Sequence, residues 1–171
     1  SDKCSSNINL LEPTNPDKLT IDRLENVMSV EEAHSIKLME KQKIEELRFQ
    51  WTVATGRFVD DKEVLKILVP PSSVQILTIV GYRSHNIPDW FMGIRQYLPN
   101  LLALTLCDFP NCNNLPSLGQ LPYLRELGFC RMESLEEWNT AYTRGKPVLD
   151  ALTIDQCAKL MIKPCAPRAT V

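Results

Sequence analysis

Residues 98–129, LPNLLALTLCDFPNCNNLPSLGQLPYLRELGF, contain one short pattern twice. The pattern is L-x-x-L-x-L, and its two copies consist of Leu101, Leu104 and Leu106, and of Leu124, Leu127 and Phe129. Apolar residues that alternate with other residues are typical of a short β-strand with one buried face. Between the copies, the leucine- and proline-rich segment Leu115–Pro122 has no helical period. The stretch therefore predicts two strands joined by an irregular crossover.

The pattern extends over the whole chain. With the fourth position of each copy as an index, the matching residues are Leu19, Leu47, Leu77, Leu104, Leu127 and Leu152, at intervals of 28, 30, 27, 23 and 25 residues. Leucine-rich repeats run about 20–29 residues, so one interval is slightly long. We predict an α/β leucine-rich-repeat solenoid, or horseshoe, with parallel strands on its concave face and helices and irregular crossovers on its convex face. Residues 1–171 would form a single domain of about six repeats.

The index positions also place the individual elements. The expected strands are Leu19–Ile21, Ile44–Phe49, Val74–Ile79, Leu101–Leu106, Leu124–Phe129 and Leu149–Ile154. Ser29 and Glu32 form a capping box that predicts a helix over Ser29–Lys43, with Ala33, Ile36 and Met39 on its buried face. Asp60 and Glu63 predict a shorter helix that ends near Leu68. Trp90, Phe91, Ile94 and Leu98 are expected to share the buried face of another short helix.

Outside these elements the sequence predicts less regular structure. Ser1–Thr14 is expected to be a frayed entry or part of an incomplete repeat, Met132–Trp138 and Asn139–Pro147 a polar loop, and the residues after Ile154 a tail. Cys157 falls at the Asn/Cys position of the repeat, where the side chain turns inward.

Composition argues against several classes of function. A net charge of −2 and a pI near 5.7 disfavour nucleic acid or an acidic membrane as the main partner. No apolar run approaches the length of a membrane span. The six cysteines include no C-x-x-C, and neither His34 nor His85 lies at ligand spacing from a cysteine, so we expect no metal site and free thiols in a reducing compartment.

An enzyme is the weakest interpretation. Asp60-Asp61 and Glu136-Glu137 are adjacent pairs whose side chains diverge, and we expect them to be solvated. Ser84 and His85 are neighbours in a loop, which does not make a nucleophile and its base. No G-x-x-x-x-G-K-[ST] motif is present to hold a phosphate. We therefore expect no catalysis and no cofactor.

Several phrases resemble one family, the plant intracellular immune receptors of the nucleotide-binding, leucine-rich-repeat type with a coiled coil. The resemblance covers roughly residues 16 to 165. It rests on residues 19–51, on Val64–Leu68 with Pro70-Pro71, on Ile79–Tyr82, on Pro88-Asp89-Trp90, and above all on Leu115–Leu124, LPSLGQLPYL. Phe109 and Met132 depart from the pattern because they stand where the repeat has Asn or Cys, so those turns must be stabilised differently.

The solenoid geometry predicts a binding surface. Residues between the inward leucines point to the concave face. The candidate protein-binding residues are Glu46, Arg48, Gln50, Ile76, Thr78, Val80, Ala103, Thr105, Cys107, Glu126 and Cys130. Other positions of the same pattern are Lys18, Thr20, Asp22, Gly128, Ala151, Thr153 and Asp155. Ile76 and Val80 either mark an apolar interface or merely express strand propensity. Cys107 and Cys130 are expected to be reduced neighbours rather than a disulfide.

The resemblance implies a function and its partners. We expect a non-catalytic recognition module of a cytoplasmic immune receptor, of which this chain is a fragment. The module would inhibit the receptor's own nucleotide-binding part and release it when a pathogen effector, or a host protein that the receptor guards, docks. The alternative is a general cytosolic scaffold for protein–protein interaction without an immune role.

Overall fold

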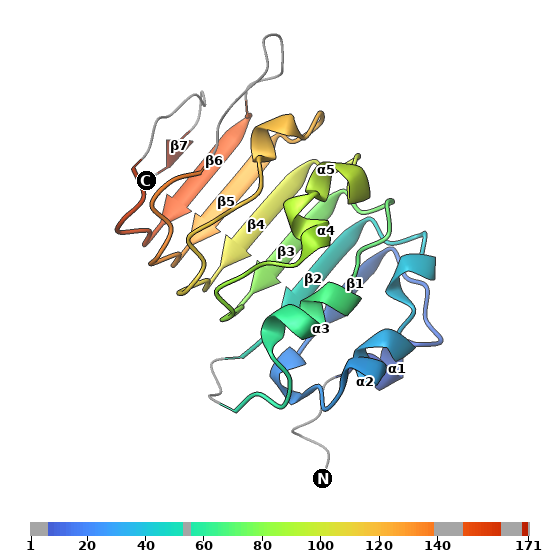
Figure 1. The fold of residues 1–171 in the computed structure, drawn as a ribbon. Coiled ribbons are helices and arrows are strands. Elements are labelled where there is room, and N and C mark those ends of the chain that lie inside the picture. The colour runs from blue at the N-terminus through green and yellow to red at the C-terminus, as the bar shows by residue number, and fades with distance from the viewer. Residues whose placement is uncertain (1–6, 53–55, 139–148, 162–168, 171) are drawn as a thin grey trace.

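One parallel sheet runs through the molecule (Figure 1). The computed structural model describes residues 7–52, 56–138, 149–161 and 169–170. Over these residues the strands follow one another across the sheet in chain order. They are β1 (Lys18–Ile21), β2 (Glu46–Gln50), β3 (Ile76–Val80), β4 (Ala103–Cys107), β5 (Glu126–Cys130), β6 (Ala151–Asp155) and β7 (Ala169–Thr170). Parallel neighbours joined in chain order are the signature of a solenoid, which confirms the predicted fold.

The register of the strands follows the index leucines. Leu19, Leu47, Leu77, Leu104, Leu127 and Leu152 lie side by side across six strands. From β2 to β6 each strand begins two residues after the predicted start. Leu101 shows why, because its N–H donates to the Leu98 carbonyl at 3.3 Å inside the crossover and not to a neighbouring strand. The first leucine of the pattern thus closes the crossover, while the second and third lie in the strand.

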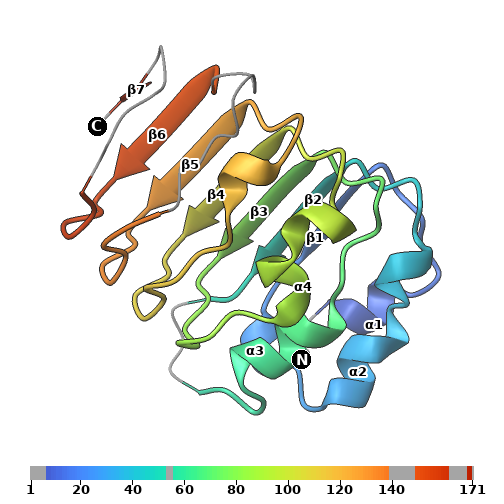
Figure 2. The same cartoon turned by 45° about the horizontal axis from the view of Figure 1, so that its top comes forward.

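The helices all lie on one side of the sheet, as Figures 1 and 2 show. The α-helices are α1 (Ile8–Leu11), α2 (Val30–Ser35), α3 (Asp61–Ile67), α4 (Asp89–Met92) and α5 (Ile94–Tyr97). Short 3₁₀ turns lie at η1 (Leu24–Asn26), η2 (Leu38–Glu40) and η3 (Leu118–Gln120). Alternate strand residues such as Leu47 and Phe49 are fully buried between sheet and crossovers. Trp90, Phe91, Ile94 and Leu98 are buried as predicted, although α4 and α5 divide them.

The helix predicted over Ser29–Lys43 is shorter than expected. Its capping box forms, since the Glu32 N–H donates to Ser29 Oγ at 3.2 Å and a Glu32 carboxylate oxygen accepts the Met28 N–H at 2.8 Å. The helix ends at Ser35 because Lys37 adopts a left-handed conformation, with φ of 50°. This break rotates the following turn. Leu38 is buried in place of Met39, which is 56% exposed.

A left-handed residue recurs in the turn after the strands. Four residues after the index leucine, the backbone has positive φ at Arg23, Gly81, Asp108, Arg131 and Gln156. The parallel hydrogen-bond ladder continues into these turns. The N–H of Gly81 donates to the Cys107 carbonyl, that of Asp108 to Cys130 and that of Arg131 to Asp155, at 2.9, 2.9 and 2.8 Å. The turns are therefore in register as strictly as the strands.

Large apolar side chains follow these turns and replace the expected asparagines. Tyr82, Phe109 and Met132 are fully buried at equivalent positions. The ring of Tyr82 lies between those of Trp51 and Phe109, at centroid distances of 5.7 and 5.2 Å. The turns at Phe109 and Met132 thus contain buried apolar side chains in place of Asn or Cys, and at Phe109 the side chain contacts the ring of Tyr82. Cys157, at the same position of the last repeat, is half-buried and packs against the core.

Three segments differ from the sequence prediction. The expected polar loop over Met132–Trp138 belongs to the core through Met132 and Leu135, both fully buried, while residues 139–148 lie outside the described part. For Ser1–Thr14 only the first alternative, a frayed entry, is wrong at Ile8, which begins α1 and is fully buried; the second, part of an incomplete repeat, stays a prediction. The predicted tail contains β7, which pairs with β6. In each case the difference arises from a long-range contact, either burial of an apolar side chain in the core or pairing with the edge of β6, which the local sequence does not predict.

Candidate protein-binding surface

All of the predicted binding residues lie on β2–β5, on the face of the sheet opposite the helices. The strands bring them into three rows that run across the sheet. The rows are Glu46, Ile76, Ala103 and Glu126; then Arg48, Thr78 and Thr105; and then Gln50, Val80, Cys107 and Cys130. We call this surface, with the outward residues of β1 and β6, the concave face. The strands thus assemble the candidate residues as the period predicts.

Charged side chains at the β1–β2 end of the concave face pair with one another. Lys18 Nζ lies 2.7 Å from a Glu46 carboxylate oxygen, and Arg48 Nε donates to Gln50 Oε1 at 3.0 Å. Both Lys18 and Arg48 are exposed. Exposed pairs of this kind contribute little to stability. They leave these two strands polar and close to neutral.

The middle of the face is less polar. Ile76 is 40% exposed, and Val80, Ala103 and Cys107 around it are half-buried. Thr78 and Thr105 lie between them and are also half-buried. A partly apolar patch bordered by charged residues has the composition of a protein interface. Strand propensity alone would explain a β-branched residue here, but it would not explain the alanine and the cysteines beside it.

The two cysteines of the face are neighbours and both are thiols in the structure. Cys107 and Cys130 pair in register on β4 and β5, and the Cys130 thiol donates to Asp155 Oδ2 at 3.7 Å. Burial, together with the adjacent Cys130 thiol, raises the pKa of Cys107 to about 12. A thiol with so high a pKa is almost never ionised at neutral pH and is a poor nucleophile. Cys107 therefore contributes an apolar surface rather than chemistry.

A hollow lies on the face where β4, β5 and β6 meet. It has a volume of about 350 Å³, and its lining includes Thr105, Gly128, Thr153 and Asp155. Sequence reasoning placed Gly128, Thr153 and Asp155 in the outward pattern but did not choose them as site residues. A glycine inside a strand was the available signal, because it often marks a place where something approaches the backbone closely.

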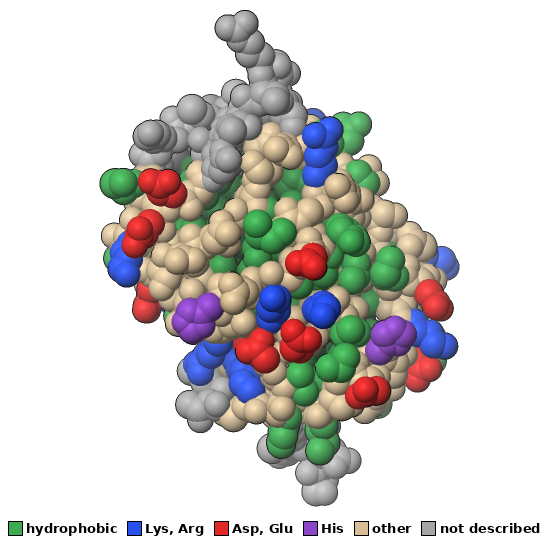
Figure 3. Space-filling view, in the orientation of Figure 1, with side chains coloured by type: hydrophobic (Ala, Val, Ile, Leu, Met, Phe, Trp, Pro, Cys, Tyr) green, Lys and Arg blue, Asp and Glu red, His purple; other side chains and the backbone are tan. Residues whose placement is uncertain are grey.

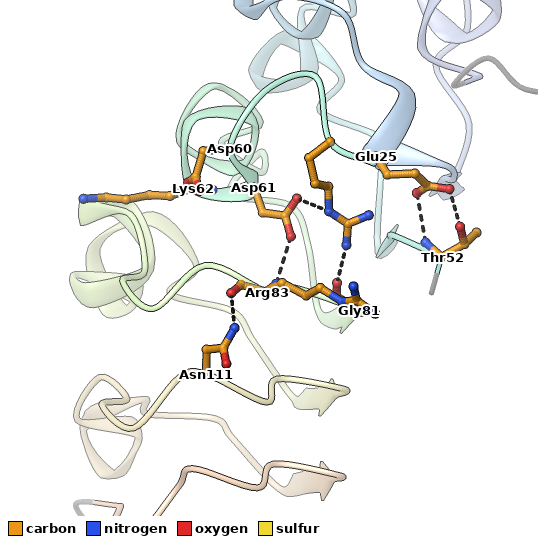
Figure 4. A network of polar contacts seen from close by, with 9 residues as sticks. Glu25, Thr52, Asp60, Asp61, Lys62, Gly81, Arg83 and Asn111 are labelled. Atoms are coloured by element: carbon orange, nitrogen blue, oxygen red, sulfur yellow. Dashed lines mark hydrogen bonds and ion pairs between the residues drawn. The ribbon is translucent and has the colours of Figure 1, made fainter. Parts of the chain in front are cut away.

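A second group of polar residues lies in the segments that follow strands β1 to β4, away from the concave face (Figure 4). Asp61 is only 3% exposed, which contradicts the prediction that the Asp60-Asp61 pair is solvated. One of its carboxylate oxygens lies 2.9 Å from Arg57 Nε, and the other accepts the Arg83 N–H at 2.8 Å. Burial raises the pKa of Asp61, although the hydrogen bond from Arg83 and the charge of Arg57 oppose the shift.

This network connects consecutive turns. Arg57 also donates to the Gly81 carbonyl at 3.3 Å, and the Asn111 amide donates to the Arg83 carbonyl at 2.6 Å. Nearby, the buried Glu25 accepts both the N–H, at 2.9 Å, and the hydroxyl of Thr52. Each of these polar groups bonds to a partner in another repeat, so the network holds the repeats together. Asp60 caps α3 by accepting the Lys62 N–H at 2.8 Å.

The described part of the chain contains no candidate for a metal site or for a membrane-spanning helix. Within residues 7–52, 56–138, 149–161 and 169–170, no group of three or more His, Cys, Asp or Glu side chains could hold a metal ion. No helix over those residues is long and apolar enough to cross a lipid bilayer.

Comparison with known sequences decides the family. A sequence model described as R13L1/DRL21 LRRs matches residues 7–132. The chain belongs to this family of leucine-rich repeats. The matched range includes strands β1 to β5 and thus most of the concave face of this R13L1/DRL21 repeat domain.

The relatives of this R13L1/DRL21 domain are disease resistance proteins of plants. A putative disease resistance RPP13-like protein 1 of Arabidopsis thaliana is 30% identical over 128 residues, which are 70% of this chain and 12% of the relative. The disease resistance protein RGA2 of Solanum bulbocastanum is 29% identical over 135 residues, or 75% of this chain and 14% of the relative. The chain thus spans about an eighth of the length of these relatives. No solved structure matches it.

Proposed function

We propose that the chain is the protein-recognition part of a cytoplasmic plant immune receptor, and that it contributes both to sensing a pathogen effector and to inhibiting the receptor at rest. The main support for this proposal is the concave face, which has paired charges on β1–β2 and a partly apolar patch around Ile76. The repeats that form this face belong to a family that also occurs in disease resistance proteins. The proposed partners are the nucleotide-binding part of the same receptor, and an effector or a guarded host protein. The proposed role is non-catalytic.

The helix side of the molecule supports this choice of surface. In Figure 3, charged side chains of both signs are interspersed with small hydrophobic areas, as on an ordinary solvated surface. Exposed hydrophobic side chains there are distributed over several crossovers, with Met28 and Met39 in one, Met92 and Tyr97 in another and Tyr123 in a third. The concave face differs because its rows are continuous from strand to strand. A partner that docks on it meets a regular surface that side-chain substitutions change without moving the backbone.

The test uses a full-length receptor that contains these repeats, expressed in leaf tissue with and without the matching effector. One variant combines Glu46→Lys with Arg48→Glu, and another combines Ile76→Asp with Val80→Asp. We expect each to cause cell death without effector, or to abolish the response to effector, because it changes charge or polarity at the proposed interface. Protein accumulation is measured in every sample.

Matched controls carry the same chemical changes on the helix side. Lys66→Glu reverses an exposed charge on α3, and Met92→Asp places a carboxylate on α4 at a residue 44% exposed, close to the 40% of Ile76. The controls should leave both resting inhibition and effector response unchanged. If the concave-face variants also leave both unchanged, the assigned surface is wrong. A native reading frame without a phosphate-binding G-x-x-x-x-G-K-[ST] module upstream would favour a general scaffold instead.

A further inference from the structure

Gly128 lies at the centre of a three-by-three group of outward residues. On β5 its neighbours two residues away are Glu126 and Cys130, and across the strands it pairs with Thr105 on one side and Thr153 on the other. The corners of the group are Ala103, Cys107, Ala151 and Asp155. Except for the two carboxylates, the residues around the glycine are small, and the missing side chain leaves the hollow described above.

The hollow has the shape to receive one side chain. If residue 128 had a Cβ atom, its nearest neighbours would be Cγ2 and Oγ1 of Thr105, both 3.4 Å away, which is ordinary van der Waals contact, so an occupant that lies over Gly128 would pack against Thr105. Thiols and threonine methyl groups give its walls an apolar character. An unbranched aliphatic side chain could lie across Gly128 and contact both Cys107 and Cys130.

The charged side chains that line the hollow in the described part of the chain are acidic. Glu126 and Asp155 are its charged lining residues. Arg125 lies 3.7 Å from a carboxylate oxygen of Asp150, and Arg131 lies 2.7 Å from one of Asp108, so these two arginines pair with other carboxylates. Among the described residues, no lysine or arginine forms an ion pair with Glu126 or Asp155. Within the described part of the chain, the hollow therefore has no paired cation to complement its carboxylates.

We propose that this hollow binds a lysine or arginine side chain of a protein that docks on the concave face. This inference rests on the proposed function, because it names the chemistry of the partner at that surface. The aliphatic stem would lie over Gly128, and the cationic head would reach Glu126 or Asp155. Residues two apart on one strand face lie about 6.6 Å apart, which is within reach of such a side chain. An apolar occupant would desolvate the carboxylates, and an acidic one would be repelled.

The probe is a set of acetylated, amidated pentapeptides, Gly-Gly-X-Gly-Gly, in which X is arginine, citrulline, leucine or glutamate. Each is titrated into the isotope-labelled 171-residue chain, and the backbone amide signals are followed by NMR. We expect the arginine peptide to shift the amides of Gly128, Cys130 and Thr153 with millimolar affinity. Citrulline has the same shape without the charge and should bind at least about tenfold more weakly. The arginine binding should also weaken as salt screens the carboxylates.

Substitutions in the hollow separate shape from charge. Gly128→Val fills the space, and Glu126→Gln with Asp155→Asn removes the charge; each should reduce arginine binding about tenfold or more. Thr20→Val, on the outward side of β1, is the matched control and should bind as the unsubstituted chain does. The amide spectrum itself shows whether each variant is folded. If Gly128→Val is not, Gly128→Ala takes its place, because its added Cβ makes only a 3.4 Å contact.

Either of two results would overturn the proposal. One is that the arginine peptide binds no better than the leucine or glutamate peptide, or does not bind. The other is that a filled or uncharged hollow binds arginine as well as before. The proposed function would survive both, because its test depends on Ile76 and Val80 on β3 and not on this hollow. Conversely, selective arginine binding beside an inactive β2–β3 surface would support the hollow and contradict the assigned receptor interface.

Discussion

Gly81 is the residue at which the turns of this solenoid tolerate the least change. Its φ of 83° lies in the left-handed region, which residues with a side chain rarely adopt; Asp108 and Arg131 enter that region in other repeats with smaller φ values of 57° and 51°. The special feature is the approach of the neighbouring repeat. A Cβ atom at position 81 would lie 2.4 Å from the Trp51 carbonyl oxygen, which is far inside van der Waals contact.

We therefore predict that Gly81→Ala destabilises the chain by more than about 2 kcal/mol, since left-handed conformation and steric overlap add. Thermal unfolding followed by circular dichroism measures the change. Gly93→Ala is the control. A Cβ atom there meets the Asp89 carbonyl oxygen at 3.5 Å without a positive φ, and we expect stability within about 1 kcal/mol of the original. Equal effects of the two substitutions would contradict the role assigned to the Trp51 contact.

The Cys107 thiol gives a pH-dependent prediction. Because its pKa is raised to about 12, its rate of alkylation by iodoacetamide should still rise about tenfold per pH unit between pH 7 and 10. In urea, where the chain is unfolded, the alkylation rate of Cys107 should stop rising once the pH exceeds the ordinary pKa of a cysteine. Peptide mapping by mass spectrometry measures both rates. A plateau near pH 9 in the folded chain would contradict the shift, and a mass increase of two hydrogens on reduction would show that Cys107 and Cys130 form a disulfide.

Single residues also mark the limit of what the sequence predicts. The left-handed residues Arg23, Asp108 and Gln156 are not glycines, so their residue types do not predict a positive φ. Their common position in the repeat is recognised only from the backbone conformation. Lys41 is 5% exposed, and its ammonium donates to the carbonyls of Glu12 and Thr14. Those acceptors are 27 to 29 residues away in sequence, and no local pattern connects them to a buried lysine.

At the scale of elements, the ion pair between Arg57 and Asp61 ties the start of α3 to the turn after β3. Its side chains are 16% and 2% exposed, and both groups have a further partner in that turn. Removing one partner leaves the other charge buried. We expect Asp61→Ala to destabilise the chain by about 3 kcal/mol.

A double-mutant cycle tests this coupling. Arg57→Ala and Asp61→Ala together should cost less than the sum of the single changes, with a coupling of about 1 kcal/mol or more in urea unfolding. The control cycle uses Lys66 and Glu63, whose side chains are about half exposed and 3.9 Å apart. That pair should show a coupling below about 0.5 kcal/mol. A coupling of the same size in both cycles would mean that burial does not strengthen the Arg57–Asp61 pair.

Helix α2 shows how far local signals reach. The capping box at Ser29 and Glu32 correctly predicts where the helix begins. The predicted end of the helix was wrong, because the left-handed Lys37 breaks the helix and the turn that follows buries Leu38 rather than Met39. Caps are local interactions and can be predicted from four residues. The end of a crossover helix depends on the sheet beneath it and cannot.

At the scale of the whole molecule, the unbroken register makes the central strands the most protected. Each of β3 and β4 pairs along its full length on both sides, whereas β1 pairs only with β2 in the described part of the chain. We predict that amide hydrogen exchange is at least about tenfold slower in β3 and β4 than in β1, because solenoids open from their ends. Mass spectrometry on peptic peptides measures this. Uniform protection across the strands would show that the sheet opens as one unit.

The period predicted the fold and the arrangement of the concave face because both depend on spacing alone. Once Leu47, Leu77 and Leu104 are known to be in register, the positions of Arg48, Thr78 and Thr105 follow. The hollow at Gly128 did not follow. It depends on the identities of residues in three strands together. That Glu126 and Asp155 do not pair with Arg125 or Arg131 is known only from the structure, in which those arginines pair with Asp150 and Asp108.

The crossovers differ in length by up to seven residues, yet the leucines of all six repeats stay aligned without a slip. The differences in length therefore lie in the crossovers and not in the strands. A genetic exchange between two such chains that breaks within a crossover would therefore transfer complete strands with their outward residues intact. Unequal exchange would add or remove whole strands from the binding surface. Such a molecule can acquire a new specificity in one step without first losing its fold.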